Sequence, residues 1–253
     1  MWRAAGDASI VAVHRRPELH TRREVTEMIR LTYCGHSALL VEGAGKKLII
    51  DPFITGNPAC TLKKEDIKVD YVIVTHGHSD HFGDAPAIAK ASGATLISNF
   101  EIASYAEKLG CKAHALHIGG AARFDFGTVK LTIAHHGSCL PDGTYGGSPA
   151  GVFLDMDGKH VYHAGDTGLF YDMKLIGDRR VDVALLPIGD NFTMGPDDAV
   201  EAVKLIRPAV VIPIHYGTFD VVKQDPVAFK KKVEAETGSR CVVLKPGESF
   251  ELP

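Results

Sequence analysis

Short apolar runs separated by glycine-rich turns set the pattern of the chain from Met28 onward. The segment IRLTYCGHSALLVEGAGKKLIIDPF holds three strand-like runs, and a glycine turn at residues 43–45 joins the last two. A continuous apolar run follows at residues 71–75, and after it come a polar loop, a helix that begins near Phe82 and a strand at Thr95. This pattern predicts a β-meander that leads into a βαβ unit.

The second half of the chain repeats this order. A hairpin signal, Asp157-Gly158, joins two of the four strands predicted at residues 129–134, 152–156, 160–164 and 183–186. Next, the segment GPDDAVEAVKLIRP predicts a helix that starts at Pro196, and AVVIPIHY predicts a buried strand. The segment DPVAFKKKVEAETG predicts a helix that ends at Gly238, and CVVLKPGESFELP predicts a closing hairpin. Together the elements predict an α/β protein, a four-layer αββα sandwich of two mixed β-sheets flanked by helices.

Composition narrows the classes of protein. A chain of 253 residues that is 45% hydrophobic can bury one sizeable core, which predicts a single domain over residues 28–253. Residues 1–27 carry weaker patterning and lack the apolar core of a signal peptide, so we expect a dispensable N-terminal extension. No run approaches the roughly 20 apolar residues that span a bilayer. The net charge of -3 gives no global attraction to membranes or nucleic acid.

The five cysteines are scattered and never form a CxxC pair, which favours a reducing cytoplasm over a disulfide framework. We therefore expect a soluble cytoplasmic protein with a small-molecule substrate and no membrane partner. A homo-oligomer is compatible with the sequence, which does not define the number of subunits.

The segment THGHSDH carries the strongest chemical signal. It follows a buried strand and precedes a helix, and it places His76, His78, Asp80 and His81 within six positions. Imidazole and carboxylate groups in a loop at the carboxyl end of a strand suit zinc, manganese or iron. The alternative is a polar loop in which Asp80 or Ser79 only caps the helix.

Three further candidates stand at the carboxyl ends of later strands: His136, Asp166 and His215. Each of them alone has an ordinary interpretation, because histidine and aspartate at strand ends often satisfy loop backbone. Their shared position favours a common site with the THGHSDH loop. A site of this kind has room for two metal ions.

Beyond these residues, the sequence resembles the metallo-β-lactamase superfamily, and within it the UlaG-like branch of metal-dependent hydrolases of mostly unassigned substrate. The resemblance runs from Met28 to the C-terminus and includes GHS at residues 35–37, DPFITGNP at 51–58, HIGG at 117–120, HAGDT at 163–167 and PIGDNFTMGP at 187–196. It implies the metallo-β-lactamase fold. It also implies that one metal ion is held by His76, His78 and His136, that a second is held by Asp80, His81 and His215, and that Asp166 bridges both.

Two departures refine this implication. His78 stands where the related flavo-di-iron oxygen reductases have a carboxylate, which favours hydrolysis over redox chemistry. Asp166 stands where true zinc β-lactamases have a cysteine, which disfavours antibiotic hydrolysis. Strand alternation directs His135 away from His136, and His117 and His163 fit structural roles, so we leave these three outside the ligand set.

Other residues have two open interpretations. His36, in the GHS loop, either supports the site or contacts substrate, or it only forms the turn. Asn191 and Thr193 lie in a loop before a helix N-terminus that could attract an anionic group, or they form a tight connection. Ser138 and Cys139 are interpreted as loop residues, since nothing indicates a base beside either.

Two divalent metal ions, zinc before manganese, iron or nickel, would share a water and lower its pKa toward neutrality. Asp80 would then act as both ligand and general base. We expect cleavage of a small-molecule ester-type bond, in a lactone, thioester or phosphoester. The alternatives are a nuclease or phosphodiesterase, which the acidic balance disfavours, and a metal-dependent sensor without turnover.

Overall fold

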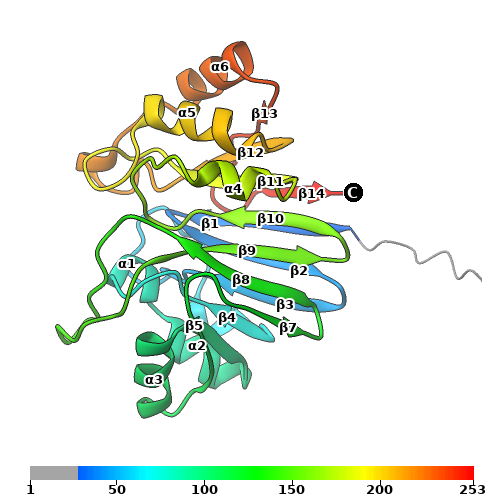
Figure 1. Cartoon of the computed structure of the whole chain (residues 1–253). Helices are drawn as coiled ribbons and strands as arrows, with labels where there is room; N and C mark the ends of the chain where they lie inside the picture. Colours follow the sequence, from blue (N-terminus) through cyan, green and yellow to red (C-terminus); the bar gives the residue numbers. More distant parts are fainter. Residues whose placement is uncertain (1–27) are drawn as a thin grey trace, which may run out of the picture.

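The computed structural model describes residues 28–253, in which two seven-stranded sheets pack face to face (Figure 1). The first sheet consists, in spatial order, of β14 (Ser249–Leu252), β1 (Ile29–Gly35), β2 (Ala38–Gly43), β3 (Lys46–Ile50), β4 (Tyr71–Ile73), β5 (Thr95–Asn99) and β6 (Lys112–Leu116). The second consists of β13 (Arg240–Cys241), β12 (Val210–Ile214), β11 (Val183–Pro187), β10 (Lys159–His163), β9 (Ala150–Met156), β8 (Gly127–Ile133) and β7 (Ala121–Phe124).

Both sheets are mixed, because antiparallel meander strands continue into parallel strands linked by helices. The outer face of the first sheet is covered by α1 (Ser79–Phe82), α2 (Ala85–Ser92) and α3 (Phe100–Lys108). The second is covered by α4 (Met173–Gly177), α5 (Pro196–Ile206) and α6 (Pro226–Glu236). The short 3-10 helices are η1 (Lys64–Asp66) and η2 (Asp220–Val222). The predicted fold class is therefore confirmed.

The main core lies between the two sheets. Side chains such as Leu31, Leu48, Leu131, Val152 and Leu185 are fully buried there. Burial of one such side chain stabilises the fold by roughly 1.5–3 kcal/mol. This core holds the two halves of the chain in a fixed relation, so loops from both halves can form one site.

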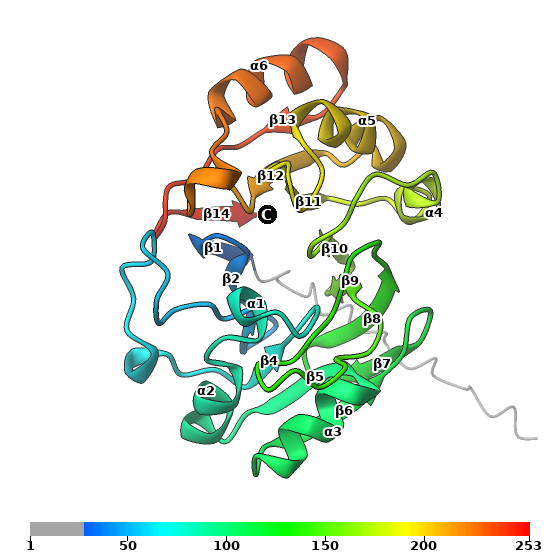
Figure 2. The same ribbon diagram turned by 90° about the vertical axis from the view of Figure 1, so that its left-hand side faces the viewer.

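That site lies at one edge of the sandwich. β3, β4 and β5 run parallel in the first sheet, and β10, β11 and β12 run parallel in the second. Their carboxyl ends meet at the edge that faces the viewer in Figure 2, where α1 also lies. Loops after these strands therefore converge, which is the usual position of functional residues in α/β proteins.

The predicted closing hairpin is wrong. β13 pairs in parallel with β12 in the second sheet, whereas β14 pairs with β1 in the first. The segment between them crosses from one sheet to the other and buries Leu244 in the core between the sheets. The Pro246-Gly247 turn signal was present, but it does not show whether the strands it separates share a sheet.

Two other expectations need adjustment. The helix expected near Phe82 ends there, and α2 begins at Ala85 after a break at Gly83. The last long helix ends at Glu236, before Gly238.

The apolar patterning did not predict β6, β7, α3 or α4. The predicted extension at residues 1–27 lies outside the described residues, and its dispensability stays a prediction.

Candidate metal centre

The loop after β4 is fixed from beneath by Asp51, a fully buried carboxylate at the end of β3. Its Oδ1 accepts the backbone N–H of Thr75 at 2.8 Å, and its Oδ2 accepts the Thr75 hydroxyl at 2.7 Å. The Nδ1 of His81 lies 2.8 Å from the same Oδ2. Asp51 therefore orients the His81 ring, so that Nε2 faces the centre of the site.

One group of three histidines joins the two halves of the molecule. Ligand atoms of His76, His78 and His136 all lie within 4.8 Å of one another. Nε2 of His76 is 3.0 Å from Nδ1 of His78, and Ser138, two residues after His136, bonds through its hydroxyl to the backbone N–H of Gly77 at 3.1 Å. This last bond holds the loop after β8 against the loop after β4.

A second group lies beside the first. Ligand atoms of His36, Asp80, His81 and His215 lie within 4.8 Å of one another. The backbone N–H of His215 donates to the His36 carbonyl at 2.8 Å. Gly189 makes room for this arrangement, because a Cβ there would stand 2.2 Å from the His215 carbonyl oxygen.

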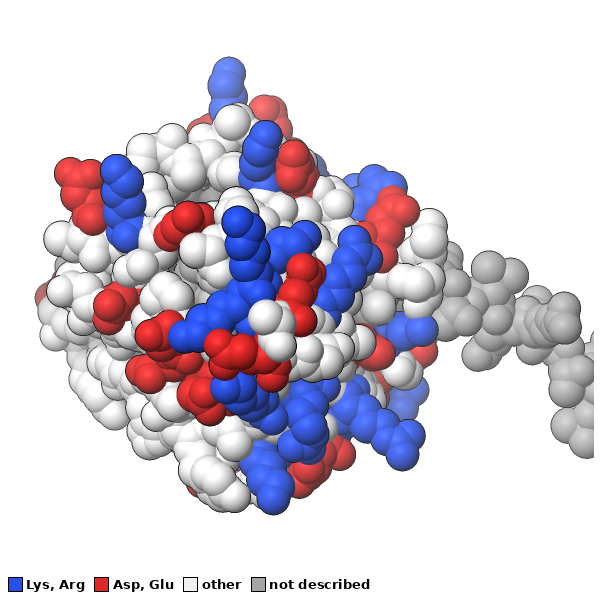
Figure 3. All heavy atoms as spheres, turned by 90° about the horizontal axis from the view of Figure 1, so that it is seen from above, with Lys and Arg blue, Asp and Glu red and all other residues white. Residues whose placement is uncertain are grey.

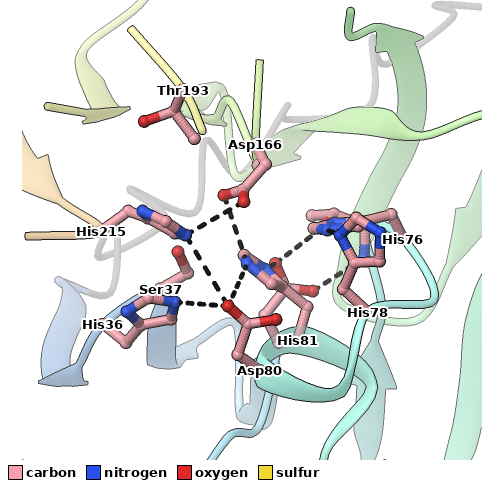
Figure 4. Close-up of polar contacts among 12 residues, drawn as sticks. His36, Ser37, His76, His78, Asp80, His81, Asp166, Thr193 and His215 are labelled. Carbon is pink, nitrogen blue, oxygen red and sulfur yellow. Dashed lines mark hydrogen bonds and ion pairs between the residues drawn. The ribbon is translucent and has the colours of Figure 1, made fainter. Parts of the chain in front are cut away.

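Asp166 lies between the two groups (Figure 4). Its Oδ1 is 3.2 Å from Nε2 of His81, and its Oδ2 is 3.0 Å from Nε2 of His215 and 3.5 Å from Nε2 of His136. The side chain is 3% exposed. One buried carboxylate thus reaches imidazoles of both groups.

Several of the atoms that meet here lie within ion-pair distance of one another but make no hydrogen bond. His81 Nε2, Asp166 Oδ1 and both ring nitrogens of His215 are buried without a hydrogen-bond partner in the described part of the chain. A buried polar atom without a partner costs about 1–3 kcal/mol. Lone pairs that converge without hydrogen-bond geometry fit a cation placed among them, and the imidazole and carboxylate set suits zinc, manganese, iron or nickel. The residues present therefore fit a metal site.

His36 differs from the other histidines of its group, because both of its ring nitrogens have partners. Nδ1 lies 3.0 Å from Oγ1 of Thr218, and Nε2 lies 3.0 Å from Oδ2 of Asp80. The ring is 1% exposed and lies edge-on to Phe53 and Phe219, with 5.7 Å between centroids in each case.

Burial and the charges of neighbouring groups shift the pKa values of the site residues in opposite directions. Burial lowers the pKa of His36 to about 4, and it also lowers the pKa values of His76 and His136. Burial opposes protonation of His81 as well, but the carboxylates of Asp166 and Asp51 hold its pKa well above the usual value. For Asp80, burial acts to raise the pKa of the carboxyl, but the hydrogen bond from His36 and the charge of His81 together outweigh burial and lower that pKa. The metal-free site thus keeps its carboxylates ionised.

The histidines left outside the ligand set lie apart from these groups within residues 28–253. His135 is exposed and packs edge-on against Phe170 at 5.0 Å. His163 is buried, with Nε2 2.9 Å from the Ser37 carbonyl oxygen and Nδ1 accepting the Gly165 N–H. His117 is exposed after β6.

The loop with Asn191 and Thr193 lies beside Asp166, since the Met194 N–H donates to the Thr167 carbonyl at 3.0 Å. Backbone and side-chain oxygens of Asp190 accept N–H groups within this loop, including that of Asn191 at 2.9 Å. Asp190 rather than Asn191 therefore closes the connection. Whether Asn191 and Thr193 touch substrate stays a prediction.

Sequence reasoning missed Asp51 and Thr218 as individual site residues. Asp51 falls in the DPFITGNP segment, and its position at the end of a strand could have indicated a supporting role. Thr218 carries no comparable signal, because its contact with His36 spans 182 positions.

Comparison with known proteins agrees with this geometry. A family model described as the beta-lactamase superfamily domain matches residues 30–215. A UPF0173 metal-dependent hydrolase of Pelotomaculum thermopropionicum is 51% identical over 229 residues, which are 88% of this chain and 100% of the relative. Another of Thermus thermophilus is 50% identical over 225 residues, which are 89% and 100% of the two chains.

Two solved structures are also similar. Igni18, described as a novel metallo hydrolase of Ignicoccus hospitalis, is 42% identical with a TM-score of 0.83, over 89% of this chain and 99% of that one. An isothiocyanate hydrolase from Delia radicum gut bacteria has a TM-score of 0.69 over 87% and 98% of the chains, and at 22% identity it shows the fold alone.

The fold and the buried His/Asp groups define a metal-dependent hydrolase. The chain belongs to the beta-lactamase superfamily. Within residues 28–253, no helix has the length and apolar character needed to cross a membrane.

Proposed function

We propose that this protein hydrolyses an ester-type bond of a small molecule with two divalent metal ions at the carboxyl edge of its sheets. His76, His78 and His136 would hold one ion, Asp80, His81 and His215 the other, and Asp166 would bridge them. Zinc is the first candidate, and manganese, iron or nickel suit the same ligands. The observation that carries the proposal is the convergence of buried atoms of His81, His215 and Asp166 that have no hydrogen-bond partner within residues 28–253.

When bound, two such ions supply a nucleophilic hydroxide at neutral pH and polarise the scissile carbonyl or phosphoryl group. The protein contributes the rest of the chemistry. Asp80 is 27% exposed in its side chain, so it is the carboxylate of the site that faces solvent, whereas Asp166 is buried. A general base needs this access to water, and we assign the role to Asp80.

His36 acts as a positioning residue for Asp80 in this proposal. Because the Asp80 carboxylate only accepts hydrogen bonds, Nε2 of His36 must carry the proton, and Nδ1 must then accept from the Thr218 hydroxyl. The buried ring is neutral at pH 7, since its pKa is about 4. The Asp80 carboxylate therefore selects the tautomer of His36, Thr218 gives the other ring nitrogen its partner, and His36 fixes the rotamer of Asp80.

Reconstitution tests the proposal. Protein stripped with a chelator would be reloaded separately with zinc, manganese, ferrous iron and nickel, and assayed against a lactone, a thioester, a phosphodiester and single-stranded RNA. We expect no turnover without metal, and turnover of a small ester-type substrate that saturates at two ions per chain. Turnover that is unchanged after verified metal removal would contradict the proposal, and cleavage of RNA alone would favour a nuclease.

A further inference from the structure

We infer that the substrate is an uncharged carboxylic ester or lactone with an apolar or aromatic group, and that anionic esters are poor substrates. This inference rests on the proposed hydrolytic function and narrows its substrate class. It is carried by the loops around the metal centre, which have exposed aromatic rings and few lysine or arginine side chains.

Three exposed aromatic residues lie on three separate loops next to the site. Tyr145, Phe192 and Phe219 are 66%, 57% and 41% exposed, whereas phenylalanine is among the residues that are most often fully buried. Isolated exposed apolar residues need no explanation, but a group around one centre marks a binding surface.

Contacts place the loops that carry these residues beside the metal centre. Phe219 packs against the ring of His36. Tyr145 precedes Gly146, whose N–H donates to the Ser138 carbonyl at 3.1 Å next to the loop of His76 and His78. Phe192 precedes Thr193, whose side chain lies near Asp166 in Figure 4.

Positive side chains are scarce at the same edge. The chain has 28 Lys and Arg, and none occurs at residues 35–37, 51–62, 76–84, 134–149, 164–172, 188–195 and 215–222, which include the candidate ligands. Lys63, directly after one of these segments, and Lys245, in the connection before β14, are exposed. Lys64, just beyond one of these segments, is already paired with Asp84 at 3.2 Å. Lys223 directly follows the segment of residues 215–222 and is exposed.

Acidic residues strengthen this contrast. Asp142, Asp172, Asp190 and Asp220 are exposed on the same segments. By contrast, Arg180, Lys204 and Arg207 line a groove at the opposite edge, where β11 and β12 begin. Figure 3 shows Lys and Arg gathered over the middle and right of the upper face, with few toward the left, where the metal edge lies.

Proteins that bind phosphate or carboxylate groups use arginine, lysine or helix N-termini with exposed N–H groups. The metal ions would attract an anion at the reacting centre itself, but a second negative group on the substrate would find no lysine or arginine at the residues named above and would lie near exposed aspartates. A phosphodiester of nucleic acid is disfavoured for the same reason. An apolar substituent would instead bury surface against Tyr145, Phe192 and Phe219.

The reaction is hydrolysis without a further reactant. The oxygen of water forms a bond to the acyl carbon, and the bond from that carbon to the leaving oxygen breaks. One proton of water passes to the leaving oxygen, so that an alcohol and a carboxylic acid result, and the acid then ionises. A lactone gives both groups on one molecule.

A matched pair of esters tests the inference on the metal-loaded protein. 4-Nitrophenyl butyrate and mono-4-nitrophenyl succinate share the leaving group and the acyl length, and only the second carries a carboxylate. We expect kcat/KM for the butyrate to exceed that for the succinate by at least about tenfold, and bis-4-nitrophenyl phosphate to be the poorest substrate. Equal or faster turnover of the succinate or the phosphate would overturn the inference.

Two variants with the same change of charge locate the origin of the preference. Phe192→Lys should reduce the preference for the butyrate by about threefold or more at low ionic strength, and salt should reverse part of this effect. Leu109→Lys is the control, since Leu109 is exposed at the far end of α3, and it should leave the preference unchanged. Equal effects of both variants would overturn the inference, because the preference would then reflect total charge.

The outcomes also separate the inference from the proposed function. If the metal-loaded protein hydrolyses none of these esters and no lactone, the proposed ester hydrolysis falls and the inference falls with it. If it hydrolyses anionic esters preferentially, the hydrolytic function stands and only the inferred substrate class is wrong.

Discussion

Nε2 of His36 lies 3.0 Å from Oδ2 of Asp80, although the two residues are 44 positions apart. The His36 ring also contacts Thr218 through Nδ1, so one imidazole links the β1–β2 turn, the start of α1 and the loop after β12. Three segments that meet only in the folded protein therefore determine where the Asp80 carboxylate points.

The positioning role of His36 predicts a graded response to substitution. His36→Ala should lower kcat by about 10–100-fold with little change in KM, because loss of a partner outside the ligand set has this magnitude. His36→Gln, whose Nε2 can still donate to Asp80, should recover much of the loss. Thr218→Val should lower kcat less than His36→Ala does, and Thr218→Ser should have a kcat near that of the wild type. Equal loss in His36→Ala and His36→Gln would argue against positioning through this hydrogen bond.

Asp80→Asn preserves size and one ligand oxygen but removes the charge and the proton acceptor. We expect normal folding and a fall in turnover of roughly 10²–10⁴-fold. Metal should remain with His76, His78 and His136, and occupancy at the other group should weaken. Elemental analysis and kinetics would be performed on one preparation, and full activity in Asp80→Asn would refute the general-base assignment.

Metal removal should destabilise the protein without unfolding it. An ion that binds the folded chain but not the unfolded chain stabilises the fold by about 2.7 kcal/mol when its free concentration is one hundred times its Kd. Two ions together would contribute about 5 kcal/mol, so for a chain of this length we expect chelation to lower Tm by about 10–20 °C. Differential scanning calorimetry measures the shift, and readdition of metal is the control. An unchanged Tm after verified removal would contradict a preformed internal site.

Alkaline pH should weaken the fold partly through Cys34. Burial raises the pKa of this thiol from 9.0 to about 12, with Cys60 adding to the effect. The unfolded chain loses this proton first, so the stabilisation is complete below pH 9 and declines as pH rises toward 12, by at most about 1.4 kcal/mol per pH unit. Urea unfolding at pH 8 and 10.5 should show a smaller decline in Cys34→Ala than in the wild type. Cys139→Ala, at an exposed position, is the control.

Local patterns predicted most of the fold because both halves repeat a meander and a βαβ unit. The strands that flank the site are short apolar runs, and their ends coincide with the HxHxDH motif and with His136, Asp166 and His215. The pattern of apolar and polar residues did not predict β6, because Lys112–Leu116 is largely exposed and so has no regular alternation of buried and exposed side chains. It also failed at the C-terminus, where β13 and β14 belong to different sheets.

The sequence predicted which residue types form the candidate site, but it did not predict the hydrogen bonds that hold them in place. Strand ends indicated which histidines and aspartates could meet, and alternation correctly directed His135 outward. The bond from Thr218 to His36 and the bonds that Asp51 accepts from Thr75 and His81 depend on tertiary packing. No local spacing rule encodes contacts of this kind.

The central claim is that two metal ions share the Asp166 carboxylate. The most direct test is a crystal of the metal-loaded protein with anomalous scattering measured on both sides of the absorption edge of the bound element. The account predicts two anomalous peaks about 3.5–4 Å apart, one beside His76, His78 and His136 and one beside Asp80, His81 and His215, with Asp166 between them. In Asp166→Asn both peaks should weaken. A single peak at full loading, or two peaks of undiminished height in Asp166→Asn, would contradict it.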